Sequence, residues 1–158
     1  MIKFLTACAH VEEMAAQIYR TMRQKAVAEN QTDLDKLWAE MAADEEAHAQ
    51  QLRLAARLSR ERVFDLVEPS QAAHPAALLK RTELMLDYVR SKKLSELEML
   101  HIADELERDF QKIHTSYTLL FQDPSMKKTF EALTKADDQH VASLQEVIRR
   151  FPKRLATK

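Results

Sequence analysis

Apolar residues recur at every third or fourth position over four long stretches of the chain, which is the spacing of one face of an amphipathic helix. These stretches predict helices over residues 2–29, 33–62, 95–122 and 124–150. Ser95 followed by Glu98 resembles a capping box at the start of the third helix. Pro124, directly after Asp123, suits the first turn of the fourth helix, and we expect Pro152 to end it.

The helical pattern weakens over residues 63–94, where Pro69 and Pro75 interrupt it. We expect this segment to be a crossover that contains a short helix at about residues 76–90. Two antiparallel helical hairpins joined by one long crossover have the connectivity of ferritin-like bundles, whereas cytokine-type bundles need two long crossovers. The pattern therefore predicts one all-α domain over residues 1–158, a ferritin-like four-helix bundle.

The composition supports this fold and excludes several classes of function. The chain has no glycine, which sheet proteins need for hairpin turns and bulges. Its 24 basic and 25 acidic side chains are spread along the chain, as on solvated helix faces, so we expect no nucleic-acid partner. No stretch approaches the ~20 apolar residues of a membrane span. The single cysteine, Cys8, excludes an internal disulfide framework and a cysteine-based metal site, and a reducing cytoplasm is the simplest compartment.

One carboxylate lies within the apolar face of each long helix. On the first helix Glu12 lies in line with Leu5 and Cys8, whereas its neighbour Glu13 lines up with Arg20. The same comparison on the other helices separates an inward carboxylate from acidic residues that face water. The inward set, with two histidines, is Glu12, Glu45, His48, Glu107, Asp137 and His140, and the outward set is Glu13, Glu46, Glu105 and Asp138.

The inward carboxylates need a compensating positive charge, because an uncompensated buried charge costs several kcal/mol. None of the core-facing positions is basic, so a metal is the economical counter-charge, and two divalent ions balance four carboxylates. Oxygen and imidazole ligands without thiolate suit Fe, Mn or Zn. A Glu from each of two helices, with Glu-x-x-His from each of two others, is the known arrangement of di-iron and di-manganese carboxylate bundles.

The Glu-x-x-His spacing is a weak signal by itself, because such pairs of common helix formers arise by chance. Glu98 and His101 match it as well. Their helix phase, however, places Glu98 on the side opposite Glu107, so we interpret this pair as solvated.

Two further polar residues lie on the core-facing side, each seven residues after an inward carboxylate. They are Tyr19, after Glu12, and His114, after Glu107. Both could donate hydrogen bonds to ligand carboxylates, and we expect this of Tyr19. Three roles stay open for His114: such a donor, an additional metal ligand, or an ordinary core histidine.

Four segments carry a resemblance to a known family: Glu12 to Tyr19, Asp44-Glu-Glu-Ala-His48, Ala103-Asp-Glu-Leu-Glu107 and Asp137-Asp-Gln-His140. Over nearly the whole chain they resemble the rubrerythrin branch of the ferritin-like superfamily. The resemblance implies a centre of two non-haem Fe ions that reacts with peroxide or oxygen. It places the iron ligands on Glu12, Glu45, His48, Glu107, Asp137 and His140, and the family's first-helix tyrosine on Tyr19.

Three features depart from the family. Asp137 stands where the family normally has Glu, and its shorter side chain would alter bridging between the ions or weaken the binding of one. His114 replaces an expected tyrosine. Only residues 152–158 follow the fourth helix, which leaves no room for the rubredoxin domain that receives electrons in classical rubrerythrins. We therefore expect a separate, rubredoxin-like electron-donor protein and, because ferritin-like relatives commonly pair, a homodimer.

The resemblance favours a di-iron oxidoreductase that reduces hydrogen peroxide or oxygen. We expect the catalytic residues to be Glu12, Glu45, Glu107, Tyr19 and His114. One alternative is a ferroxidase, or an iron-binding or sensing protein that turns over no organic substrate, and another is an oxygen-activating hydroxylase. A further interpretation is a decayed site that persists as a hydrogen-bonded polar cluster in a partner-binding bundle, which predicts no stoichiometric metal.

Overall fold

Five α-helices make up the part of the chain that the computed structural model describes, residues 2–58 and 75–155. They are α1 (Ile2–Ala28), α2 (Thr32–Leu58), α3 (Pro75–Ser91), α4 (Glu96–Thr118) and α5 (Pro124–Leu155). No strand occurs within these residues, so the predicted all-α class is confirmed. None of these helices is both long enough and apolar enough to cross a membrane.

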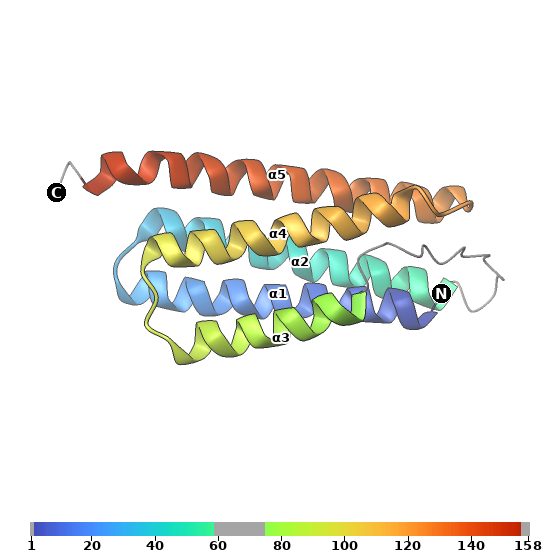
Figure 1. The fold of residues 1–158 in the computed structure, drawn as a ribbon, viewed down its shortest axis with the longest axis horizontal. Helices are drawn as coiled ribbons and strands as arrows, with labels where there is room; N and C mark the ends of the chain where they lie inside the picture. Colours follow the sequence, from blue (N-terminus) through green and yellow to red (C-terminus); the bar gives the residue numbers. More distant parts are fainter. Residues whose placement is uncertain (1, 59–74, 156–158) are drawn as a thin grey trace.

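The helices form two antiparallel hairpins, α1 with α2 and α4 with α5, which lie against each other as a four-helix bundle (Figure 1). α3 belongs to the connection between the hairpins and packs along α1. This arrangement confirms the predicted ferritin-like bundle and the short helix in its crossover. The predicted end of the second helix at residue 62, and the crossover as far as residue 74, lie outside the described residues.

The connection from α1 to α2 turns sharply without a glycine. Asn30 adopts a φ of 56°, in the left-handed region that asparagine tolerates better than most residues. The N–H of Gln31 donates to the carbonyl of Ala26 at 2.9 Å and closes the end of α1. α1 therefore ends at Ala28, one residue before the expected position.

Side-chain caps begin both helices of the second hairpin, α4 and α5. The capping box is confirmed: the Glu98 N–H donates to Ser95 Oγ at 3.3 Å, and the Ser95 N–H donates to the Glu98 carboxylate at 2.7 Å. α4 ends at Thr118, four residues earlier than predicted. The N–H groups of Leu120 and Phe121 donate to the carbonyl of Tyr117 at 3.0 and 3.2 Å and close the helix, and Asp123 then caps α5 by accepting the N–H of Met126 at 2.9 Å.

The prediction that Pro152 ends the last helix is wrong, because α5 continues to Leu155. Proline lacks the N–H that would donate to the carbonyl of Ile148 four residues earlier. One missing hydrogen bond near the end of a 32-residue helix does not stop the neighbouring residues from continuing it.

Large aromatic side chains fill the bundle on both sides of its midpoint. Tyr19 and Trp38, both fully buried, stack with 5.9 Å between ring centroids. Nearer the α4–α5 turn, Phe121 and Phe130 pack at 4.8 Å. Burial of each such side chain contributes about 1.5–3 kcal/mol of stability. The two aromatic layers leave the polar residues described next in the middle of the bundle.

Candidate metal centre

The six side chains predicted to face the core are all buried. The carboxylates are 0–1% exposed and the two histidines 7–8%. They are Glu12 on α1, Glu45 and His48 on α2, Glu107 on α4, and Asp137 and His140 on α5. The predicted burial is confirmed, and their role as metal ligands stays a prediction.

The residues predicted to face outward lie at the surface. The exposed ones are Glu98, His101, Glu105 and Asp138. Glu13 and Glu46 are half-buried instead of fully exposed, because each forms an ion pair with an arginine of the neighbouring helix. The helix phase has therefore separated adjacent acidic residues into a buried and a surface set.

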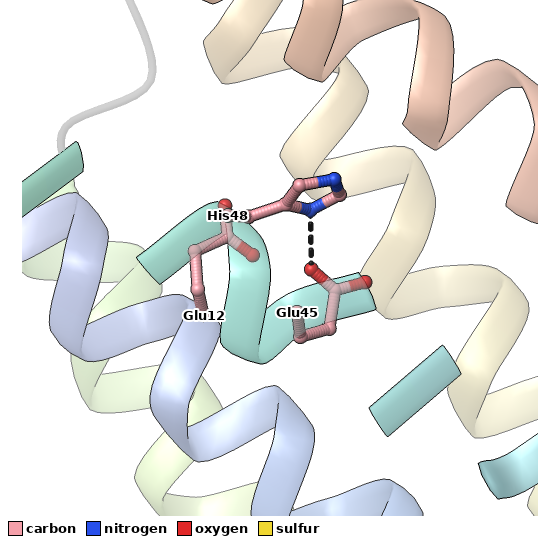
Figure 2. Close-up of side chains that lie close together, drawn as sticks. All are labelled: Glu12, Glu45 and His48. Atoms are coloured by element: carbon pink, nitrogen blue, oxygen red, sulfur yellow. Dashed lines mark hydrogen bonds and ion pairs between the residues drawn. The ribbon is translucent and has the colours of Figure 1, made fainter. Parts of the chain in front are cut away.

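The first group that could hold a metal joins α1 and α2. Glu12, Glu45 and His48 each offer one ligand atom, and these atoms lie within 4.8 Å of one another. Figure 2 shows the three side chains converging, with His48 Nδ1 2.9 Å from Glu45 Oε2. Two carboxylates and one imidazole are a suitable donor set for Fe, Mn or Zn.

The second group joins α2 to the other hairpin. Glu45, Glu107 and His140 also offer ligand atoms within 4.8 Å of one another. His140 Nδ1 lies 3.2 Å from Glu45 Oε1 and 3.2 Å from Glu107 Oε2. Because Glu45 belongs to both groups, the two candidate positions are adjacent and share one carboxylate.

Asp137 is buried but belongs to neither group. Its Oδ2 lies 2.8 Å from Nδ1 of His114, and His114 Nε2 lies 3.2 Å from Glu12 Oε1. His114 therefore bridges two of the predicted ligands. Of the three roles left open for this histidine, the contacts favour a hydrogen-bond donor to carboxylates, and the short Asp137 side chain is held beside it.

Tyr19 lies on the core-facing side of α1, as the sequence predicted. Its hydroxyl donates a short hydrogen bond to Glu107 Oε1, and its ring is fully buried. Burial, followed by the negative charge of Glu107, raises the pKa of this hydroxyl well above its ordinary value. Tyr19 therefore stays protonated and fixes the orientation of the Glu107 carboxylate.

The buried charges fit a metal. Glu12 Oε2 and Asp137 Oδ1 are buried and accept no hydrogen bond from the described residues. No lysine or arginine is buried among the residues whose side chains the structure describes, which in α5 end at Phe151. The four carboxylates outnumber the three imidazoles beside them, so bound cations would complete both the charge and the coordination of the free oxygens.

The carboxylates hold protons strongly while no cation compensates them. Burial, and then the charge of Glu45, raises the pKa of Glu12 to about 8. Burial, and then the charge of Glu107, raises the pKa of Glu45 to about 7. Burial also raises the pKa of Asp137 to about 6, although His114 opposes this shift.

Two of the histidines are held in the charged form. Burial by itself lowers the pKa of His114, but Asp137 and Glu12 outweigh it and raise the pKa to about 10. Burial likewise lowers the pKa of His140, and Glu107 and Glu45 raise it to about 12. Since a metal ligand must be an unprotonated imidazole, an ion bound at His140 would displace a proton.

We expect the metal-free protein to lose stability as the pH rises from about 5.5 to about 8.5. Glu12 has a folded pKa of about 8 against its ordinary 4.5, and His114 about 10 against 6.5, so the folded state binds more protons than the unfolded state. The stability is fully present below the unfolded pKa and is lost as the pH passes the folded pKa. Each extra proton changes the free energy of unfolding by about 1.4 kcal/mol per pH unit.

Urea-unfolding midpoints of chelator-treated protein at the two pH values measure this effect. Glu12→Gln removes one titrating group and should give a smaller change of midpoint with pH. Glu13→Gln, at the neighbouring half-buried position, should leave the change as in the parent. A midpoint that is constant or rises toward pH 8.5 would contradict the prediction.

An open groove connects the centre to solvent between α2 and α5. It has a volume of ≈ 610 Å³, and its lining includes His48, His140, Asp44 and Ala136. Asp44 has no role among the residues predicted from helix phase, yet its Oδ2 lies 3.1 Å from His140 Nε2. The position of Asp44 directly before Glu45 was the only hint in the sequence that it lies near the centre. Helix phase cannot predict its contact with His140, because the two residues lie 96 positions apart on different helices.

Comparison with known proteins gives one match. A family model described as Rubrerythrin matches residues 3–148. Neither a curated protein nor a solved structure matches the chain. The family match covers all six predicted ligands and agrees with the resemblance seen in the sequence.

Proposed function

Because the chain belongs to the rubrerythrin family, we propose that it is a non-haem di-iron protein that reduces hydrogen peroxide with electrons from a separate donor. The observation that carries the proposal is the pair of buried groups that share Glu45. Glu12, Glu45 and His48 would hold one ion, and Glu45, Glu107 and His140 the other. Bound iron would supply the redox chemistry: two Fe(II) give one electron each, and hydrogen peroxide with two protons becomes two waters.

Tyr19 and His114 hold the carboxylates of this centre in place. Tyr19 donates to Glu107, and His114 contacts both Glu12 and Asp137, so three of the carboxylates have fixed orientations before any ion binds. Fixed ligand carboxylates favour metal binding and keep its geometry constant. The aromatic layers cover the centre on either side, and the groove between α2 and α5 is its opening to solvent.

A small space beside Glu12 suits a small oxidant. A space of ≈ 10 Å³ is lined by Cys8, Glu12 and His114 together with apolar residues of α1, α3 and α4. That is room for about one water molecule. A space of this size suits peroxide or oxygen, whereas the larger groove between α2 and α5 has room for an organic substrate, so product analysis has to separate the hydroxylase alternative. Burial raises the pKa of Cys8, so its thiol stays protonated and is no redox partner at neutral pH.

Iron handling is the second candidate, and the groove between α2 and α5 supports it. This groove leads from solvent to both histidines, and its volume of ≈ 610 Å³ has room for a hydrated cation. A protein of this kind would oxidise Fe(II) for storage or sensing, and would not be reduced again for a further cycle.

The test is peroxide consumption by protein loaded anaerobically with Fe(II). One addition of hydrogen peroxide should oxidise two Fe(II) for each peroxide consumed, which the absorbance of Fe(III) measures. With an added reductant, the protein should continue to consume peroxide over many cycles. The parent is compared with Glu105→Gln, an exposed substitution on α4 that should behave identically. Oxidation that stops after one cycle despite the reductant would favour iron handling, and absence of bound iron would overturn both functions.

A further inference from the structure

His140 has partners on both ring nitrogens. Nδ1 faces Glu45 and Glu107 at 3.2 Å, and Nε2 lies 3.1 Å from Asp44 Oδ2. The Asp44 side chain is 59% exposed and lines the groove between α2 and α5. A carboxylate at the solvent side thus holds the nitrogen that points away from the centre.

The corresponding position in the other hairpin has no carboxylate. On α2 the order is Asp44-Glu-x-x-His, whereas on α5 it is Ala136-Asp-x-x-His. Ala136 lines the same groove. His48 Nδ1 faces Glu45 at 2.9 Å, and no carboxylate of the described residues contacts its Nε2. The two histidines of the centre are therefore supported unequally.

We propose that Asp44 is a positioning residue for His140 and makes the two metal positions unequal, so that the position containing His140 binds a divalent ion more tightly than the one containing His48. This inference rests on the proposed metal-binding function. A carboxylate that accepts Nε2–H leaves Nδ1 free for the metal, fixes the rotation of the ring and increases its basicity. Loss of such a partner typically reduces metal affinity about 10–100-fold.

A general effect of negative charge is the competing explanation, and the groove offers a matched control. Glu40 lies one helical turn before Asp44, lines the same groove and is 64% exposed on its side chain. It pairs with Lys36 at 3.8 Å, not with a histidine. Glu40→Gln therefore removes the same charge from the groove without removing the contact to His140.

The experiment is calorimetric titration of the metal-free full chain with Zn(II), which cannot change oxidation state. The parent should bind in two steps of different affinity. Asp44→Ala should weaken the tighter step about 10–100-fold, and the weaker step, which is coupled to it only through the shared Glu45, should change by less than that. Glu40→Gln should change both steps by no more than about twofold.

A double-mutant cycle assigns the effect to one histidine. Asp44→Ala should have no further effect on the remaining step in His140→Ala, but should retain its full effect in His48→Ala. In the imidazole ¹⁵N–¹H spectrum of the Zn(II)-loaded protein, the Nε2–H signal of His140 should shift in Asp44→Ala and not in Glu40→Gln.

Two equal steps in the parent, or equal losses in Asp44→Ala and Glu40→Gln, would overturn the inference and leave the metal-binding function standing. Absence of any Zn(II) or Fe(II) binding by the parent would overturn the function itself. The two failures are therefore distinguishable in one titration series.

Discussion

Glu45→Gln should abolish stoichiometric metal binding at both positions, because Glu45 is the carboxylate that the two groups share. The substitution keeps the size of the side chain but removes the charge that would bind both ions. The expected fall in affinity exceeds the ~10–100-fold cost of losing a residue that only supports a ligand. Elemental analysis after anaerobic Fe(II) loading and desalting measures the metal per chain.

The adjacent Glu46→Gln is the matched control. Glu46 is half-buried and pairs with Arg20 at the surface, so this variant should load metal as the parent does. Circular dichroism should show the same helix content in both variants. Retention of one ion at parental occupancy in Glu45→Gln would show that this carboxylate serves one position and not two.

His114→Leu should destabilise the metal-free protein by about 3–5 kcal/mol, the cost of removing one partner from a buried ion pair. His114 is 2% exposed and faces Asp137 Oδ2 at 2.8 Å and Glu12 Oε1 at 3.2 Å, so the variant leaves two buried carboxylates without this cation. Urea unfolding at neutral pH in the presence of a chelator gives the free energy of unfolding.

A second variant separates the loss of charge pairing from the change of shape. His114→Leu with Asp137→Leu replaces both members of the closest pair and should recover part of the lost stability. His101→Leu, at an exposed histidine of the same helix, should change it by no more than about 0.5 kcal/mol. A loss below about 1 kcal/mol in His114→Leu would show that this histidine does not compensate the carboxylates.

Helix phase is the part of the site that the sequence could predict. Glu12 and Glu13 are adjacent and chemically alike, yet the apolar residues three, four and seven positions away determine that only Glu12 is buried. The same reasoning excluded Glu98 and His101, which are exposed. Such predictions succeed because the spacing of side chains around one helix is fixed by its backbone.

Contacts between helices could not be predicted in this way. The pairing of Asp137 with His114 and of Asp44 with His140 depends on how far each helix is rotated and shifted against its partner. Helix ends were also less predictable, because they depend on individual backbone groups. α4 closes through backbone bonds to Tyr117 four residues before its predicted end, and the missing N–H of Pro152 does not end α5.

The shared carboxylate Glu45 lies at the seam between the two hairpins, the interface of α1 and α2 with α4 and α5. Helices pack closely along their lengths within each hairpin, whereas α1 approaches α4, and α2 approaches α5, less closely. Glu45 comes from one side of this seam, and Glu107 and His140 come from the other. An ion bound by these three residues would link the two hairpins directly, so metal binding and the packing of one hairpin against the other would be coupled.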